Sequence, residues 1–405
     1  MPSIDLTITI IKIVVILFTL LTAAAYLVLL ERWIAAWVQD RRGPNRVGIP
    51  LTKIKMFGLG QPLADGLKFI FKEEYTPAHV DKFLYTLAPI SILVAAILPF
   101  AVIPFGSALP TFNIGGEPVN VQLTLAPQID VGMIFVFAMG SIAVYGVILG
   151  GWASNNKYSF LGGLRSSAQL IAYELPLGLG ILGVVLATGS LRLDDIIREQ
   201  ATTGTWNILV QPLGFLVFLI ASFAESARLP FDLPEAEQEL IGGYHTEYSG
   251  LRLLLYLIAE FLHMVTAAFL ITILFFGGWH LWGLTGSTDE GITWVTALLR
   301  VIVLTIKVMG VIVFFMLVRW SWPRFRFDQL MSLAWKVMLP LGMVNLVIVA
   351  VLVEYHSQIL ALLGGSHAAL YASLWAIAIA TWLVAGIVAP LSTDNRPRLE
   401  AADRL

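Results

Sequence analysis

The chain has 405 residues, of which 58% are hydrophobic and only 13% are charged. This composition indicates a polytopic membrane protein and excludes an ordinary soluble domain. Cysteine is absent, so the chain can hold neither a cysteine-ligated iron–sulfur cluster nor a disulfide. The formal net charge of −2 says little about partners, because the distribution of charge matters more than its sum.

Long, continuous apolar runs predict membrane helices and argue against a barrel of short alternating strands. The nine predicted windows are 7–30, 85–105, 131–151, 170–189, 207–226, 251–276, 295–318, 334–354 and 367–390. The first run is too long for the core of a signal peptide and no small-residue cleavage site follows it, so we expect it to be a retained span.

The connection after the first window contains a pattern of apolar residues at near-helical spacing. Leu59, Leu63, Leu67, Ile70 and Phe71 recur beside charged side chains. This pattern predicts an amphipathic helix in the membrane interface. A surface helix that packs on the protein itself would show the same pattern.

Lysine and arginine are distributed unevenly between the connections. The stretch from the first window to the second carries nine of them, whereas 106–130, 278–294 and 355–366 carry none. The positive-inside rule therefore predicts an amino terminus outside and a carboxyl terminus in the cytoplasm. Arg192 and Arg198 are minor exceptions in a connection predicted to lie outside.

The connection 226–250 is acidic although this count places it on the cytoplasmic face. Together with Glu225 at the end of the preceding predicted helix, the connection contains six acidic residues but only one basic residue, Arg228. Pro230, Pro234 and the glycine pair 242–243 predict an irregular backbone, which near a bilayer needs cover from protein or a wet cavity. A soluble partner would supply that cover. The six acids are Glu225, Asp232, Glu235, Glu237, Glu239 and Glu247.

A few ionisable residues fall within or at the ends of the predicted spans, namely Glu31, Glu174, Glu225, Glu260 and Lys307. Glu260 is the deepest, and a charged carboxyl at such depth costs about 2.5–3.5 kcal/mol. It must be neutral, paired or hydrated, which makes it a candidate for a proton path. A hydrogen bond between helices is the structural alternative.

A basic turn follows the first span, with Arg32, Arg41 and Arg46 around a Gly-Pro-Asn sequence. The positive-inside bias alone would explain these charges. Beside Trp33 and the amphipathic helix, they could also bind the polar head of a lipophilic substrate such as ubiquinone or menaquinone. Tyr244, Tyr248 and Phe231 could line the route, although aromatic belts at the interface are common.

Ordered motifs run through these regions. They are Glu31-Arg32, RRGPNRVG (41–48), QPLAD (61–65), FKE (71–73), GWASNNKYS (151–159), RSSAQ (165–169), Tyr173-Glu174, PFDLPEAE (230–237), GYHTEYSG (243–250) and RFRFDQLM (324–331). In these motifs the chain closely resembles the quinone-site membrane subunit of respiratory complex I, which is the H subunit of bacterial NADH:quinone oxidoreductase. The resemblance covers most of the chain up to about residue 355.

The resemblance implies an all-α membrane fold of eight core helices at the junction of the membrane and peripheral arms, and it implies roles for particular residues. The quinone-binding residues would be Arg32, Trp33, Asp65, Lys68 and Phe231. The intramembrane proton path would use Glu174, Glu225 and Glu260. The acidic link to the quinone chamber would use Asp232, Glu235, Glu237, Glu239 and Glu247.

The resemblance also implies partners, cofactors and location. Quinone would be the substrate, and the iron–sulfur clusters and flavin would belong to partner subunits of both arms. This chain would bind no cofactor covalently or through a metal and no nucleic acid, and it would span the bacterial inner membrane among lipids many times. Residues 1–355 would form the H-subunit domain. Residues 356–405 would add a ninth helix and a cytoplasmic tail that serve in anchoring or packing.

Other functions remain open on the sequence. The same fold could serve a ferredoxin-driven, photosynthetic or hydrogenase-type complex, in which only the electron donor differs. The buried acids and Lys307 would also suit a free-standing cation/proton antiporter, and a passive anchor would need none of the acids for activity. We predict a subunit of a proton-pumping NADH:quinone oxidoreductase.

Overall fold

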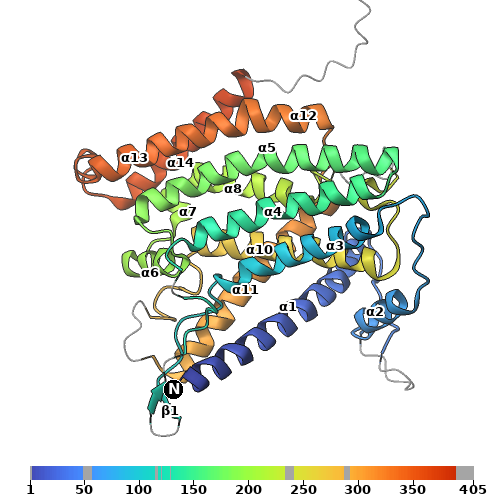
Figure 1. The fold of residues 1–405 in the computed structure, drawn as a ribbon. Helices are drawn as coiled ribbons and strands as arrows, with labels where there is room; N and C mark the ends of the chain where they lie inside the picture. Colours follow the sequence, from blue (N-terminus) through green and yellow to red (C-terminus); the bar gives the residue numbers. More distant parts are fainter. Residues whose placement is uncertain are drawn as a thin grey trace, which may run out of the picture.

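The computed structural model describes residues 2–48, 57–114, 117–119, 121–127, 129–232, 241–286 and 292–388. In these ranges the chain folds almost entirely into helices, eight of which are long and apolar enough to cross a membrane (Figure 1). The eight spans comprise α1 (Pro2–Val38), α3 (Lys82–Ile97) with the turn that extends it to Ala101, α4 (Gly132–Ala153), α5 (Lys157–Thr188), α10 (Gly250–Phe275), α11 (Trp294–Ser321), α13 (Leu339–Leu362) with the helical segment from Phe327 that precedes it, and α14 (His367–Val388). The predicted all-α, polytopic architecture is confirmed.

Shorter elements join these helices. They are α2 (Gln61–Phe71), η1 (Leu98–Ala101), α6 (Leu193–Thr203), α7 (Asn207–Val210), α8 (Pro212–Glu225), η2 (Gly243–His245), α12 (Phe327–Ser332), the π-helical turn η3 (Leu333–Met338), and the strands β1 (Phe112–Ile114) and β2 (Glu117–Val119). The two strands pair antiparallel with Phe112 opposite Val119. This small hairpin is the one sheet in the described ranges.

The predicted window 207–226 contains a broken helix. α7 ends at Val210, and α8 has only 14 residues. Pro212 lacks an N–H and restricts the residue before it, and Gln211 has φ −129° and ψ 59°, which are not helical. α8 is therefore shorter than the ~20 residues that a full crossing needs, and it packs along α5.

The helix predicted at 170–189 begins earlier than expected, at Lys157. The first half of this helix contains polar residues, which lower the local hydropathy and so shorten the predicted span. Several of these residues are nevertheless buried between helices. Gln169 is fully buried, and its Nε2 donates to the carbonyl oxygens of Ala224 at 2.9 Å and Phe231 at 2.8 Å. Hydropathy misses this half of α5 because its polar groups bind backbone instead of water.

α2 is the predicted amphipathic helix, and none of its residues is buried. The apolar side chains of Leu63, Leu67, Ile70 and Phe71 are exposed. A helix that packed its apolar face on this chain would bury them, so their exposure favours the membrane-interface alternative. α2 lies at one end of the bundle, here called the α2 side, and α6 and the hairpin lie at the other, the α6 side (Figure 1).

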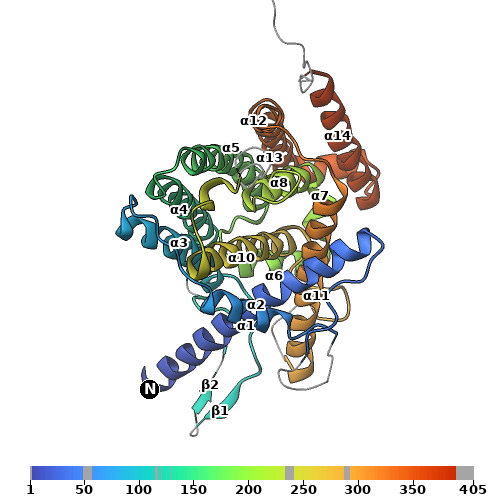
Figure 2. The same ribbon diagram turned by 90° about the vertical axis from the view of Figure 1, so that its right-hand side faces the viewer.

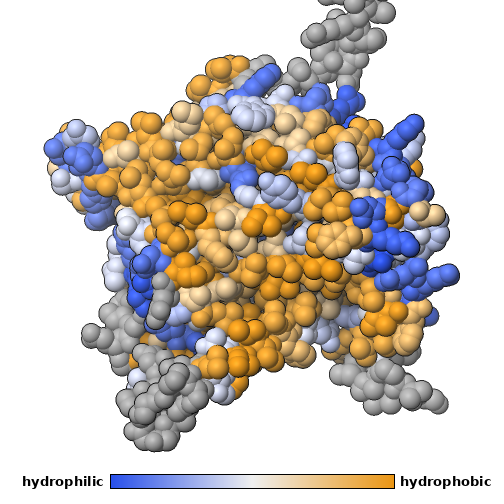
Figure 3. All heavy atoms as spheres, in the orientation of Figure 1, coloured by the Kyte–Doolittle hydropathy of each residue, from blue (hydrophilic) through white to orange (hydrophobic). Residues whose placement is uncertain are grey.

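The surface of the molecule is consistent with a membrane location. In the space-filling view, hydrophobic residues cover the middle of the visible face, and hydrophilic residues gather towards its two ends (Figure 3). Viewed from the α2 side, many helices are seen nearly end-on, with α10 inside a ring formed by α3, α4, α5, α8 and α11 (Figure 2). α10 is accordingly the most buried candidate span, with 78% of its apolar window buried.

On the α2 side, the segment before α10 rests on α5 at one glycine. A Cβ at Gly162 would lie 2.7 Å from backbone atoms of Gly243, closer than real Cβ contacts. The absent side chain lets η2 approach α5 closely. This contact holds the end of the acidic connection against the bundle.

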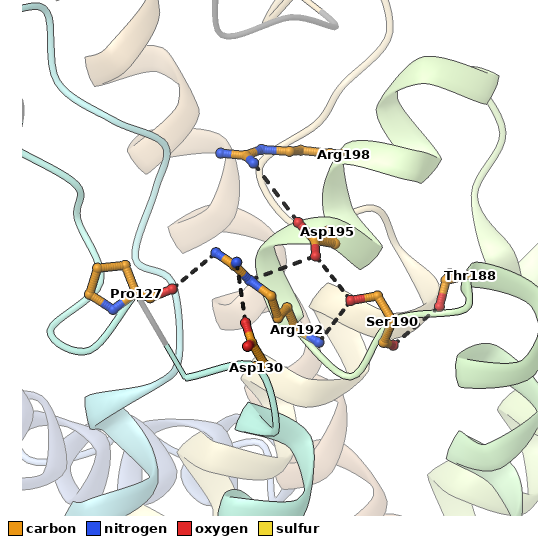
Figure 4. A network of polar contacts seen from close by, with 7 residues as sticks. All are labelled: Pro127, Asp130, Thr188, Ser190, Arg192, Asp195 and Arg198. Carbon is orange, nitrogen blue, oxygen red and sulfur yellow. Dashed lines mark hydrogen bonds and ion pairs between the residues drawn. The ribbon is translucent and has the colours of Figure 1, made fainter.

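On the α6 side, Arg192 joins the start of α6 to the segment that precedes α4 (Figure 4). Its guanidinium donates to the Pro127 carbonyl oxygen at 3.0 Å and pairs with Asp130 at 3.5 Å and Asp195 at 3.7 Å. Arg198 also pairs with Asp195, at 3.9 Å. The two arginines that depart from the positive-inside pattern are thus matched by local carboxylates.

Lys307 has a structural role. Its Nζ donates to the carbonyl oxygens of Phe276 at 2.7 Å, Gly278 at 3.0 Å and His280 at 2.6 Å, and it lies 4.5 Å from the centre of the Trp206 ring. The last carbonyl groups of a helix have no partner within it and attract cations. Lys307 on α11 therefore caps the end of α10.

We predict that Lys307→Met lowers the stability of the protein by about 1–3 kcal/mol, because buried carbonyl groups lose their donor. The midpoint of thermal unfolding in detergent, followed by tryptophan fluorescence, measures this loss. The matched control is Lys336→Met, since Lys336 is exposed. An unchanged midpoint combined with lost ion transport would contradict the capping role and support the antiporter alternative.

Candidate functional site

A buried carboxylate on α1 is bound by two arginines. Glu31 is only 8% exposed, and Arg228 Nη1 donates to its two carboxyl oxygens at 3.0 and 3.3 Å. Arg319 at the end of α11 donates to Oε1 of the same carboxylate. The Arg228 guanidinium also lies 4.4 Å from the ring centre of Phe261 on α10. This ion cluster attaches the start of the acidic connection to α1, α10 and α11.

The next residue on α1 points to a different partner. Arg32 Nη1 lies 2.8 Å from Asp65 Oδ2 on α2, and Gln61 Nε2 donates to the other Asp65 oxygen at 2.9 Å. The side chains of Arg32 and Asp65 are 45% and 26% exposed, respectively. The structure therefore brings together two predicted quinone-binding residues in an ion pair that solvent or a ligand can reach.

The other three predicted quinone-binding residues have different surroundings. Trp33 Nε1 donates to the Pro44 carbonyl oxygen at 3.0 Å, which fixes the basic turn against α1. Lys68 is exposed on α2. Phe231 is 4% exposed and stacks on Phe325 with ring centres 5.5 Å apart, so it lies in the core.

Asp232 follows Phe231 and is also buried. It is 5% exposed, and its Oδ2 lies 3.5 Å from Arg324 Nη2. Burial of a carboxylate is costly without a cation nearby. The pair therefore holds the first part of the acidic connection against the segment that precedes α12. Glu235, Glu237 and Glu239 lie outside the described residues.

Two of the predicted proton-path acids line a small internal cavity. Glu225 and Glu260 lie on its wall together with His263 and Tyr244, and its volume is about 40 Å³. One water needs roughly 10–15 Å³ of such volume and two to four polar partners, so the cavity has room for water. The Tyr244 hydroxyl lies 3.3 Å from Glu260 Oε1. These groups can form a hydrated proton site between helices.

Glu174 joins this site through α4. Ser141 Oγ donates to Glu174 Oε1, and a Cβ at the adjacent Gly140 would lie 3.2 Å from Glu225 Oε1. Two consecutive residues of α4 thus lie against the two carboxyl groups. The structure brings together Glu174, Glu225 and Glu260, which are far apart in the sequence.

A stack of tyrosines leads from this site towards Glu247. Tyr85 and Tyr248 are stacked at 4.1 Å between ring centres, Tyr248 contacts Tyr256 at 5.0 Å, and Tyr256 contacts Tyr244 at 5.2 Å. Burial raises the pKa of Tyr248 to about 12, so its hydroxyl keeps its proton at neutral pH. At the far end, the Tyr85 hydroxyl donates to the Glu247 carbonyl oxygen at 2.6 Å.

Glu247 itself is held on the α2 side. Asn156 Nδ2 donates to Glu247 Oε1 at 2.5 Å, and both residues lie in motifs identified in the sequence. Ring contacts and hydrogen bonds therefore connect Glu247, through four tyrosines, to Glu260. The sequence identified both acids but gave no sign of the tyrosines between them, except Tyr244 and Tyr248 as aromatic residues near an interface.

Sequence reasoning missed the partners of Glu31. Arg228 is 197 positions away and Arg319 is 288 positions away. Arg228 stood out as the one cation of the acidic connection, but nothing in the sequence pairs it with α1. Among the described residues, no group of three or more His, Cys, Asp or Glu is arranged to hold a metal ion.

We predict that Glu31→Gln lowers stability by about 3–5 kcal/mol, because it leaves two arginines without their buried counter-ion. The thermal midpoint of the detergent-solubilised protein measures the effect. Glu354→Gln, at an exposed position, is the control. If both variants melted together with the unmodified protein, the ion cluster would not be stabilising.

Comparison with known proteins gives consistent results. A sequence model of the NADH dehydrogenase family matches residues 11–350. An H subunit of NADH-quinone oxidoreductase from Geobacter metallireducens is 47% identical over 346 residues, which is 85% of this chain and 96% of that protein. An H subunit of NADH-quinone oxidoreductase from Cytophaga hutchinsonii is 46% identical over 83% of this chain and 94% of its own length.

A third relative comes from Protochlamydia amoebophila. Its NADH-quinone oxidoreductase H subunit is 46% identical over 81% of this chain and 92% of its own length. The matches agree with the resemblance drawn from the motifs, and the family model ends within α13, before α14 begins. The chain belongs to the NADH dehydrogenase family, together with these H subunits of NADH-quinone oxidoreductase.

Proposed function

We propose that the chain is the membrane subunit of a proton-pumping NADH:quinone oxidoreductase that forms part of the quinone chamber and links quinone reduction to proton translocation. One observation carries the coupling role. The carboxyl groups of Glu225 and Glu260 line a cavity among apolar helices, and a row of tyrosines in ring contact leads from Glu260 to the backbone carbonyl of Glu247 on the α2 side. A structural anchor has no need of acids in such costly positions.

The quinone end of this function would lie at Arg32 and Asp65. Their ion pair is partly exposed and stands next to α2, whose exposed apolar side chains offer a lipophilic molecule a path from the bilayer. The Arg32 guanidinium can donate to a quinone carbonyl oxygen. Trp33 directly follows Arg32, and Lys68 lies three positions after Asp65 on α2. Phe231 would contribute only after its stack on Phe325 had opened.

Partner subunits would supply the electrons. Two electrons from their iron–sulfur clusters, originally from NADH through a flavin, and two protons would convert quinone to quinol. The peripheral-arm subunits would cover the α2 side, where the basic turn and the acidic connection lie. Other membrane-arm subunits and lipids would contact the apolar flanks.

Coupling would depend on charge. Transfer of electrons to the quinone before its protons arrive would change the charge near Asp65 and the acidic connection, in which Asp232 is buried against Arg324. A shift of this pair or of Glu235, Glu237 and Glu239 would alter the proton affinity of the carboxyl groups behind them. Coupling requires two states with different proton affinities, and two arrangements of these polar groups would provide them.

Location and domain division follow from the same proposal. The protein would lie in the bacterial inner membrane with its amino terminus outside and its carboxyl terminus in the cytoplasm, so that the α2 side faces the cytoplasm. Residues 1–355 would form the H-subunit domain, and 356–405 would be an addition. The end of the family match at residue 350 supports this division.

The alternative functions receive less support. Ferredoxin-driven and hydrogenase-type complexes would use the same site with another donor, but the relatives described above are named for NADH and quinone. An antiporter would need Lys307 available for ion exchange, and its Nζ is bound to three carbonyl oxygens.

We predict that Arg32→Ala lowers quinone-dependent NADH oxidation in membranes by about tenfold, the loss expected for one charge-assisted hydrogen bond to the substrate. NADH oxidation by an artificial acceptor, which bypasses the quinone site, should stay near the level of the unmodified protein. Lys336→Ala, at an exposed position, serves as the control. Equal losses with both acceptors would remove Arg32 from quinone binding.

We predict that Glu260→Gln lowers the number of protons translocated per quinone reduced, because the amide cannot release a proton into the cavity. Proton uptake by vesicles, measured together with NADH oxidation, gives this ratio. Glu354→Gln is the exposed control. Unchanged quinone reduction and pumping in Glu260→Gln would favour the passive anchor.

A further inference from the structure

A cavity of about 680 Å³ lies under the first half of α14, apart from the quinone and proton sites. Its walls come from the end of α5, from α6 and α7, and from α13 and α14. This volume falls within the range of about 300–1,000 Å³ that is typical of sites for small ligands. The cavity lies on the α6 side, the end of the bundle opposite α2.

The wall formed by α6 and α7 carries one carboxyl group, that of Glu199, and the hydroxyl groups of Thr203 and Thr205. The donor groups of this wall already bind backbone carbonyl oxygens. Thr203 Oγ1 donates to the carbonyl oxygen of Glu199 at 2.9 Å. Gln200 Nε2 and Asn207 Nδ2 donate to the carbonyl oxygens of Ile273 and Leu274, each at 2.9 Å.

No described cationic side chain pairs with the Glu199 carboxyl, and burial raises its pKa. Burial disfavours the charged form of this carboxyl group, and a bound cation would favour it. This wall therefore suits a positively charged group.

The opposite wall carries donors. His356 near the end of α13 and His367 at the start of α14 have ring centres 6.5 Å apart, and His367 lies 6.3 Å from the Tyr371 ring. Imidazole N–H groups can donate to an anion in either protonation state. The remaining lining is largely apolar, with Val349, Leu352, Val353, Leu370 and Leu374.

We propose that this cavity binds a phospholipid whose headgroup ends in a primary ammonium, as in phosphatidylethanolamine. The phosphate would accept hydrogen bonds from His356 and His367, and the ammonium would donate to Glu199. One acyl chain would lie along the apolar residues of α13 and α14. The opposed donors and acceptor match a zwitterion, and the apolar wall distinguishes a lipid from a free zwitterion.

The choice of a primary ammonium rests on hydrogen bonding. A primary ammonium can donate to the carboxylate and the threonine hydroxyls, whereas a quaternary ammonium cannot donate at all. An anionic headgroup without an ammonium would bring negative charge towards Glu199. Because α14 lies beyond the family match, the site is specific to chains that carry this added helix, and it does not depend on the proposed quinone function.

The test uses the full chain within its detergent-solubilised complex, stripped of lipid. Native mass spectrometry measures binding during titration with phosphatidylethanolamine, phosphatidylcholine and phosphatidylglycerol of matched acyl chains, and with inorganic phosphate. We expect the ethanolamine lipid to bind at least about tenfold more tightly than the other two, which corresponds to ~1.4 kcal/mol.

Substitutions test which part of the lipid headgroup each wall binds. The double variant His356→Ala with His367→Ala should weaken binding of all three lipids by about tenfold, the effect of losing donors to the phosphate. Glu199→Gln should abolish only the preference for the ethanolamine lipid over phosphatidylglycerol. His79→Ala, on the α2 side, is the control and should bind as the unmodified protein does.

Three results would overturn the site. They are equal affinity for the three lipids, binding that is indifferent to both sets of substitutions, and binding of inorganic phosphate but not lipid with the same dependence on the histidines. If the double alanine variant does not fold, as judged by its thermal midpoint, His356→Gln and Glu199→Gln carry the same test.

Discussion

The contact between Glu31, Arg228 and Arg319 joins the parts of this protein on which the others depend. One carboxylate, 8% exposed, holds α1, the start of the acidic connection and the end of α11 together. Arg228 can remain buried only because the carboxylate is there, and the carboxylate can remain buried because Arg228 and the partly exposed Arg319 compensate its charge. The arrangement leaves the neighbouring Arg32 to turn outwards to Asp65, where a substrate can reach it.

Buried polar groups continue this organisation into the bundle. Gln169 on α5 binds the carbonyl oxygens of Ala224 and Phe231, which fixes both the end of α8 and the beginning of the acidic connection. Glu225 stands at that same helix end. Glu225 and the acidic connection are therefore physically linked, because one side chain holds the segment between them.

The two ends of the molecule differ in the side chains that they present and in the contacts that these make. On the α2 side, an accessible ion pair, an exposed apolar helix and a line of tyrosines lead to internal carboxyl groups. On the α6 side, arginines are matched by aspartates, Lys307 caps α10, and α14 covers a cavity with donors on one wall and an acceptor on another. The first arrangement suits chemistry and proton transfer, whereas the second suits structural and lipid contacts.

Much of this could be predicted from sequence. Apolar windows located eight long helices and the broken α7–α8 pair, because burial in a bilayer requires such runs whatever their neighbours are. The apolar windows missed the first half of α5, where polar side chains bind backbone groups within the protein. The motifs indicated the family and the acids, yet the role of each acid stays a prediction.

The sequence alone determined that the chain spans a membrane, that it carries a few costly acids inside it, and that its motifs are those of the NADH dehydrogenase family. Only the tertiary structure decided which partners those charges have. Arg228 with Glu31, Lys307 with the end of α10, and Tyr244 with Glu260 are pairs set by helix packing. Hydropathy and spacing report the local cost of a charge, but the group that compensates it comes from a different helix.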